Sequence, residues 1–293
     1  MDRSYIDDYG TRLVAQGKSP GTVRNYVRAV GYLADSLESR GKDWDTARQI
    51  DCEAWLAGMA SRGVTPSYRN QCLAGCKGFF KFLEDELWRD GQVSPMRKMK
   101  SARVRARVPS FMPDEVLAWV IAACADEKDR FLRARDEALI RFLLDTGLRR
   151  TECAELELDA VNLATRRVRV VGKGGKERHV AFGVRTKMAI QRYLRERKEH
   201  PSASSKRLWL GRRGDLSAQT VYEIVARRGV RGDAHLYPHR LRRSWAVRAE
   251  VDVIDLMALG GWDSPEMARR YKSESEAERA AANYSRNSVG DRF

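Results

Sequence analysis

A strongly basic segment with a proline at each end divides this chain and limits how it can fold. Residues 95–109 read PMRKMKSARVRARVP, and the stretch 97–107 within them carries six Lys or Arg and no Asp or Glu. Like charges at this density make poor core material, and the two prolines interrupt regular structure. The segment therefore predicts a linker at 95–110 between two folded domains, 1–94 and 111–293.

The length and composition agree with two domains. The chain has 293 residues, of which 43% are hydrophobic, enough to fill two modest cores. No stretch approaches the roughly 18 to 20 apolar residues of a membrane helix. The polar start MDRS is followed by no apolar signal core. We therefore expect a cytoplasmic protein with no membrane partner.

The cysteines and histidines predict no metal site. The five cysteines are odd in number, and none forms a C-x-x-C pair. Cys72 and Cys76 lie four residues apart on an apolar helical stripe, so we expect both in a core. Only four histidines are present, and none clusters with carboxylates. The chemistry is therefore expected to run without a built-in ion.

Residues 1–94 have the pattern of a small helical bundle. Ser19-Pro20 and Thr65-Pro66 each place a capping hydroxyl before a proline, an arrangement typical of a helix start. Apolar side chains then repeat at helical spacing over 23–37 and over 73–83. The bundle is expected to be all α.

Residues 111–293 combine helices with a small β element. One helix is predicted to begin at Pro113-Asp114, and another to end near Gly147. Between Arg167 and Phe182 the pattern changes to two strands around a glycine-rich turn, which predicts a β-hairpin. Helical patterns then resume. The predicted fold class is mainly α, with a small β-sheet or hairpin in the second domain.

The charge of the chain favours a polyanionic partner. Lys and Arg exceed Asp and Glu by 15, which is typical of nucleic-acid binding. We expect the basic linker to lie against DNA, where each neutralised phosphate releases counterions. Cations scattered over the helices are explained equally well as ordinary solvated charge. The candidate DNA contacts are Lys18, Arg24, Arg28, Arg69, Lys77, Arg97, Lys98, Lys100, Arg103, Arg105, Arg107, Lys176, Arg240 and Arg243.

Four short motifs follow one another in the second domain. They are TGLRRTE at 146–152, GKGGKER at 172–178, PHRLRRSW at 238–245, and LGGWDSP at 259–265 with Tyr271 shortly after it. Taken alone, the first motif fits the end of a helix with surface charge. The second motif lacks Walker spacing and, taken alone, fits the tip of a basic hairpin. In the third, His239 and Arg242 lie on one helical face, an arrangement suited to a phosphate.

In this order and spacing the motifs resemble the tyrosine recombinase, or phage integrase, family. The resemblance covers nearly the whole chain, since TPSYRNQCLAGCKGFFKFL at 65–83 is similar to the N-terminal core-binding, SAM-like domain of that family. It implies a two-domain clamp on DNA and a site-specific recombinase. The segment between Arg242 and Trp262 is a few residues shorter than in typical members, which leaves the motifs intact.

The resemblance also implies the roles of individual residues. The implied catalytic residues are Arg149, Lys173, His239, Arg242, Trp262 and Tyr271, with Glu152 as a supporting acid. Two arginines would bind the scissile phosphate, the hairpin lysine would protonate the leaving 5′-oxygen, and Tyr271 would attack. Because a tyrosine with a pKa of about 10 is mostly protonated at neutral pH, clustered cations are needed near it. Tyr284 is a rival nucleophile, but it lies outside any motif.

Partners follow from the same resemblance. They are double-stranded DNA recombination sites, and further copies of the chain in a tetramer joined by the C-terminal tail helix near 277–284. The chain begins almost directly with the core-binding domain, which favours simple sites or a host DNA-bending or directionality factor. No cofactor, metal or ATP is implied. Two alternatives stay open: a type IB topoisomerase-like enzyme that relaxes DNA, and a non-catalytic DNA-binding protein.

Overall fold

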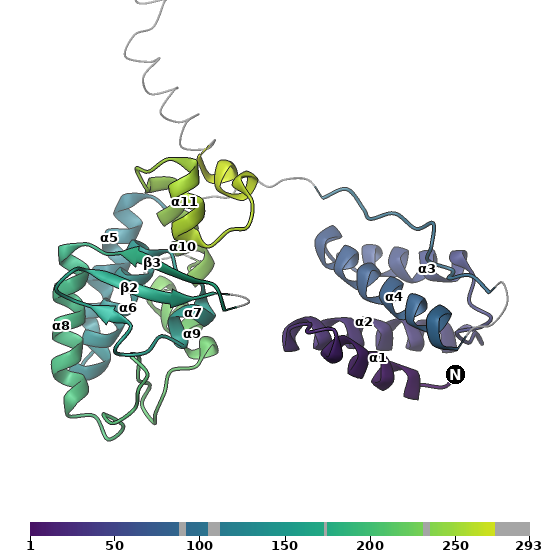
Figure 1. The fold of residues 1–293 in the computed structure, drawn as a ribbon, viewed down its shortest axis with the longest axis horizontal. Coiled ribbons are helices and arrows are strands. Elements are labelled where there is room, and N and C mark those ends of the chain that lie inside the picture. The colour runs from purple at the N-terminus through teal and green to yellow at the C-terminus, as the bar shows by residue number, and fades with distance from the viewer. Residues whose placement is uncertain (88–91, 105–111, 173–174, 231–234, 273–293) are drawn as a thin grey trace, which may run out of the picture. The chain divides into compact units, whose positions relative to one another are not determined.

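A computed structural model gives the fold of the chain as two compact units, Met1–Arg107 and Val108–Phe293. The structure describes residues 1–87, 92–104, 112–172, 175–230 and 235–272. Within these ranges helices predominate and one small sheet is present (Figure 1), which confirms the predicted fold class. No helix in the described ranges combines the length and the apolar character needed to cross a membrane.

The first unit is a bundle of helices. Its helices are α1 (Ser4–Ala15), α2 (Pro20–Glu38), α3 (Gln49–Ser61) and α4 (Pro66–Glu86). Two of them begin at the predicted caps, because the Ser19 hydroxyl accepts from the Thr22 N–H at 3.2 Å and the Thr65 hydroxyl from the Tyr68 N–H at 3.4 Å. Each cap satisfies a backbone donor that has no partner inside its helix.

Aromatic rings fill the core of this bundle. Phe79 and Phe80 on α4 are fully buried, and Trp44 meets both of them edge-on at 4.7 and 6.1 Å between ring centroids. Cys72 and Cys76 lie buried in the same core, as predicted from their spacing.

The start of the basic segment packs on this unit. Met96 is fully buried in the bundle core, with Met99 beside it. The Asn70 side-chain amide exchanges two hydrogen bonds of 2.8 Å with the backbone of Ala102. Apolar residues inside the charged run therefore attach it to α4, while its cations at 97, 98, 100 and 103 stay exposed.

The second unit is built around a central helix, α6 (Arg130–Thr146). Its elements are α5 (Asp114–Ala122), the 3-10 helix η1 (Ala123–Asp126), α6 (Arg130–Thr146), α7 (Arg150–Ala154), β1 (Val161–Asn162), β2 (Arg167–Val171), β3 (Glu177–Ala181), α8 (Val184–Lys198), α9 (Ala218–Val230), α10 (Pro238–Arg248) and α11 (Val253–Gly260). Residues 265–272 are also helical. The core lies around α6, which packs along α8 and against α10.

The sheet is antiparallel, with strand order β1-β2-β3. Val168 pairs with Val180, and both are buried against the core. The predicted hairpin is therefore confirmed. The third strand, β1, was not predicted, because a strand of two residues is too short to show alternation.

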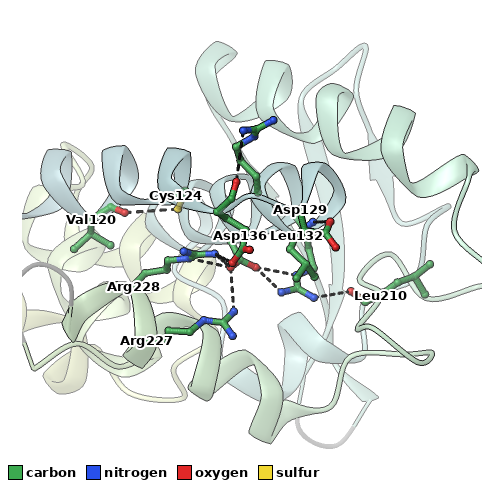
Figure 2. Close-up of polar contacts among 11 residues, drawn as sticks. Val120, Cys124, Asp129, Leu132, Asp136, Leu210, Arg227 and Arg228 are labelled. Atoms are coloured by element: carbon green, nitrogen blue, oxygen red, sulfur yellow. Dashed lines mark hydrogen bonds and ion pairs between the residues drawn. The ribbon is translucent and has the colours of Figure 1, made fainter.

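A buried ionic cluster joins α6 to α9 (Figure 2). Asp136, which is fully buried, accepts at Oδ1 from Arg135 (2.6 and 2.9 Å) and at Oδ2 from Arg228 (2.6 and 2.9 Å) and Arg227 (3.2 Å). Arg228 also donates to Glu127 at 2.9 Å. The cluster fixes the C-terminal end of α9, the helix that precedes α10 in the chain. Sequence patterns did not predict it.

Candidate active site

The end of α6 turns sharply at Gly147. Its φ is +58°, and a Cβ at this position would stand 2.1 Å from the ring of Trp245 on α10. Only glycine fits both the left-handed conformation and this close approach. The turn brings Arg149 to the N-cap of α7, where its backbone N–H donates to the Glu152 carboxylate at 2.8 Å.

Three successive carbonyls at the end of α11 each accept from an arginine. The Leu259 carbonyl accepts from Nε of Arg178 at 2.9 Å, that of Gly260 from Nη2 of Arg242 at 2.6 Å, and that of Gly261 from Nη2 of Arg149 at 2.7 Å. The last carbonyls of a helix have no partner within it and carry partial negative charge, so they attract cations.

The two glycines of the LGGW motif make this arrangement possible. Gly261 has a φ of +61°, and a Cβ there would lie 3.0 Å from Nη1 of Arg178. A Cβ on Gly260 would lie 2.6 Å from the ring of Trp262. The helix end therefore approaches the guanidinium groups and the indole more closely than a chain with side chains would allow.

Glu152 is buried between two of the arginines. Its carboxylate accepts from Arg178 at 2.7 and 3.1 Å and from Nη1 of Arg149 at 2.8 Å. Burial raises the pKa of Glu152, but the hydrogen bonds from Arg178 and the Arg149 backbone outweigh it and bring the pKa to about 2. Glu152 is thus a permanent anion at neutral pH.

The Arg242 side chain is buried within the site. Its Nη1 donates to the Gly147 carbonyl, and its guanidinium lies 4.7 Å from the centre of the Trp262 ring. Loss of hydration, with Arg149 close by, lowers the pKa of Arg242 to about 10. It therefore stays positively charged at neutral pH, stacked on an aromatic face.

His239 lies in the first turn of α10 and keeps an exposed face. The pKa of His239 lies below its usual value of 6.5, mainly because partial burial removes hydration from the imidazole. The charges of Arg243, Arg242 and Arg149 lower it further. The imidazole is therefore mainly neutral at pH 7, with one N–H to donate and one nitrogen to accept.

The rings of Trp262 and Tyr271 are stacked, with centroids 5.3 Å apart and planes at 23°. Tyr271 is buried, on the helical stretch 265–272. Arg242 lies over the same indole, so Trp262 contacts both the tyrosine ring and the arginine. The structure thus brings together five of the predicted catalytic residues and the supporting Glu152.

The charge balance of this site favours an anion. Arg149, Arg178 and Arg242 face a single carboxylate, Glu152, and the side chain of Arg149 is 40% exposed. Guanidinium groups match phosphate oxygens with paired donors. Comparison with protein families decides the class: a model described as the phage integrase family matches residues 111–278.

The chain belongs to the phage integrase family. The family's N-terminal SAM-like domain also matches, over residues 6–87. Tyrosine recombinase XerC of Alcanivorax borkumensis is 29% identical over 264 residues, which cover 87% of this chain and 83% of that protein. The chain is therefore a tyrosine recombinase, a class of site-specific DNA recombination enzymes.

Solved structures agree with the fold. XerH site-specific recombinase bound to palindromic difH substrate, in a post-cleavage complex, matches with a TM-score of 0.78 at 17% identity, over 97% of this chain and 84% of that one. A lambda integrase tetramer bound to a Holliday junction matches with a TM-score of 0.70 at 17% identity, over 92% of this chain and 76% of that one.

The predicted hairpin lysine of this recombinase, Lys173, lies outside the described residues. The flanks of the turn are described: the Gly172 N–H donates to the Lys176 carbonyl at 2.8 Å. Lys176 itself is 80% exposed and pairs with Asp263 at 3.3 Å. The hairpin and the loop after α11 therefore face each other on the surface.

The predicted DNA contacts of the recombinase differ in exposure. Those with exposed side chains are Lys18, Arg24, Arg28, Arg97, Lys98, Lys100, Arg103 and Lys176, and those half-buried are Arg69, Lys77, Arg240 and Arg243. Lys77 donates to the Met99 carbonyl at 2.6 Å, and Arg240 to that of His235 at 2.7 Å. Arg105 and Arg107 lie outside the described residues.

Sequence reasoning missed Arg178 and the carbonyls of residues 259–261. Arg178 stands in the GKGGKER motif, so its position was visible, but its partners were not, since they lie about 26 and 81 residues away in the chain. Within the described ranges no group of three or more His, Cys, Asp or Glu side chains is placed to hold a metal ion.

Proposed function

We propose that this recombinase cleaves and rejoins DNA through a covalent link between Tyr271 and a 3′-phosphate. The observation that supports this most directly is that Trp262 contacts both Tyr271, the proposed nucleophile, and Arg242, a proposed phosphate-binding residue. A phosphate bound by the arginines would lie close to the phenol, and orientation of this kind is a large part of catalysis.

The proposed step balances with this chain's residues, the DNA and water. The Tyr271 oxygen attacks phosphorus and releases its proton to water, the bond to the 5′-oxygen breaks, and Lys173 donates a proton to that oxygen. Arg149 and Arg242 stabilise the charge that develops on the non-bridging oxygens. Loss of one such preorganised donor typically costs about 10² to 10³ in rate. Neutral His239 adds a hydrogen-bond donor to the same phosphate.

The covalent phosphotyrosine conserves the energy of the broken bond. A 5′-hydroxyl from a partner duplex then attacks it, restoring the phosphodiester and releasing Tyr271, which needs neither ATP nor a metal ion. Exchange of one strand pair at a time passes through a Holliday junction. The fold shared with a lambda integrase tetramer on such a junction supports assembly of four copies on DNA.

We extend the proposal to the partners. The tail at 273–293, which lies outside the described residues, would join neighbouring copies in the tetramer. The exposed cations of the basic segment would contact the DNA backbone. A host DNA-bending or directionality factor would assist at the recombination site. Such an enzyme, encoded by a mobile element, would act in the cytoplasm next to the nucleoid.

The test is direct detection of the covalent intermediate. The protein is incubated with supercoiled plasmid carrying DNA from its own genetic neighbourhood, and the products are separated on denaturing gels. We expect protein attached to a 3′ DNA end, lost in Tyr271→Phe and kept in Tyr284→Phe. An adduct that persists in Tyr271→Phe would contradict the assigned nucleophile. Relaxation of plasmid without exchange between two sites would favour topoisomerase activity, and specific binding with no adduct would favour a DNA-binding role.

A further inference from the structure

Arg178 uses every nitrogen of its guanidinium on acceptors within the protein. On β3, its Nη2 and Nη1 donate to the two oxygens of Glu152 at 2.7 and 3.1 Å, and its Nε donates to the Leu259 carbonyl at 2.9 Å. Its side chain is only 11% exposed. Each nitrogen of this guanidinium thus has an acceptor within the protein, which fixes the group in place.

Arg149 shares the Glu152 carboxylate with Arg178 and donates to a different carbonyl at the same helix end. It donates to Oε1 of Glu152 at 2.8 Å and to the Gly261 carbonyl at 2.7 Å, yet its side chain is 40% exposed. Arg178 and Arg149 therefore bracket one carboxylate and one helix end. The buried arginine completes the partners of Glu152, and the exposed arginine keeps a face toward solvent.

The electrostatics of the pair explain why two arginines are needed. A carboxylate with a single guanidinium partner forms a closed ion pair, whose field is largely cancelled at a distance. With two guanidinium partners the group of three carries a net charge of +1. Because Arg178 is buried and Arg149 is exposed, that surplus charge is available at Arg149, where a phosphate would bind.

We propose that Arg178 is a positioning residue that keeps Arg149 oriented and electrostatically free to bind the scissile phosphate. This inference rests on the proposed role of Arg149. The inference also explains why β3 carries an arginine at position 178. Through this side chain, β3 is connected to Glu152 at the start of α7 and to the Leu259 carbonyl at the end of α11.

The experiment measures cleavage under single-turnover conditions on the DNA site found in the adduct assay. Rate constants are obtained at saturating enzyme, so they do not depend on the fraction of each variant that folds. Two substrates are compared: the normal one, and one with sulfur replacing the bridging 5′-oxygen at the scissile phosphate. A thiolate leaves without a proton, so the sulfur substrate removes the need for a general acid but not for phosphate stabilisation.

We expect Arg178→Met to cleave both substrates about 100-fold more slowly than the native protein, as loss of a phosphate-stabilising donor would. Glu152→Gln should be slowed similarly, and the double variant should be little slower than either single one, because both changes act through Arg149. Lys173→Met, by contrast, should recover on the sulfur substrate. Arg178→Lys, which keeps the charge but not the planar fork, should lie between native and Arg178→Met.

Arg169→Met is the matched control. Arg169 is also on the hairpin and also pairs with a glutamate, Glu177 at 3.1 Å, but both side chains are about half exposed. Its cleavage rate should stay within about threefold of native, as expected for an exposed pair.

Three results would overturn the inference. Native rates in Arg178→Met would show that Arg149 needs no such partner. Recovery of Arg178→Met on the sulfur substrate would place its effect on the leaving group instead. Rate losses that multiply in the double variant with Glu152→Gln would mean that the two residues act independently. Failure of the proposed function itself would be seen separately, as an adduct that survives Tyr271→Phe.

Discussion

Trp262 contacts both Tyr271, whose ring it stacks on at 5.3 Å, and Arg242, whose guanidinium stands 4.7 Å from the indole centre. The indole thereby helps to position the proposed nucleophile and a proposed phosphate-binding residue. The Trp245 ring also packs near it, with centroids 6.1 Å apart. Trp262 therefore acts mainly through packing, and its size matters more than its single N–H.

Replacement of Trp262 should impair cleavage in proportion to the ring that is lost. Trp262→Phe keeps an aromatic face, and the loss of part of a stacking contact of about 0.5–1.5 kcal/mol should lower the rate by no more than about tenfold. Trp262→Ala leaves both neighbours unsupported, and misplacement of this kind should cost about 100-fold. Single-turnover cleavage rates measure both effects.

Trp119→Ala is the control for this series. Trp119 is 55% exposed on α5, so its removal should leave the cleavage rate unchanged. If Trp262→Ala cleaved as fast as Trp119→Ala, the contacts of Trp262 would have no role in placing Tyr271.

Glu152 should stabilise the fold in a pH-dependent way. Its pKa falls from 4.5 to about 2 on folding, which corresponds to about 3 kcal/mol at neutral pH. A carboxyl group whose pKa is lowered on folding stabilises the folded state at pH values above its unfolded-state pKa. This contribution is lost as pH falls from about 4.5 toward 2. In denaturant titrations, Glu152→Gln should therefore be less stable than native at pH 7, by an amount that shrinks below pH 4.5. A difference that stays constant with pH would contradict the assignment.

The turn after α6 should not accept a side chain. Gly147→Ala would place a methyl 2.1 Å from the Trp245 ring in a left-handed conformation, so we expect a loss of more than about 2 kcal/mol of unfolding free energy. Gly175→Ala is the matched control, because Gly175 has a φ of +77° but no neighbour within 4 Å. Thermal melting should separate them, and equal shifts would mean that the contact with Trp245 adds nothing.

Local chemistry explains how much could be predicted from sequence. The capping hydroxyls of Ser19 and Thr65, each followed by a proline, define two helix starts within a few residues of chain. The change from helical spacing to alternating apolar and polar residues marks the hairpin. Such signals depend only on neighbours in the sequence. The proposed catalytic residues could be named from sequence because their motifs follow one another in the order typical of the family. The structure places Arg149, Arg242 and Glu152 close together.

Long-range polar contacts could not be predicted in this way. The three helix-end carbonyls carry no side-chain signal at all, since any residue supplies a carbonyl. Arg178 was visible in its motif, but nothing local shows that its partner is Glu152, 26 residues earlier. Asp136 could not be predicted to be buried either, because in the sequence it looks like any charged residue on a helix.

Removal of the tail tests assembly rather than chemistry. Deletion of residues 276–293 should weaken pairing of two sites, because small apolar positions at 277, 280 and 281 would be lost from contacts between copies. Binding to one site should remain, since the site and the basic segment are intact. Gel shifts with one and two sites measure the two stages, and undiminished recombination by the shortened chain would contradict this role for the tail.

Charge removal at Asp136 should destabilise the second unit more than removal of another α6 carboxylate. In Asp136→Asn three arginines lose a fully buried anion, and breaking a buried pair costs about 3–5 kcal/mol. Glu137→Gln is the matched control: Glu137 pairs with Arg141 and Arg192 at 2.8 and 2.9 Å but is 22% exposed, so about 1 kcal/mol is expected. Denaturant unfolding measures both, and equal losses would mean that solvent screens the Asp136 cluster as it screens a surface pair.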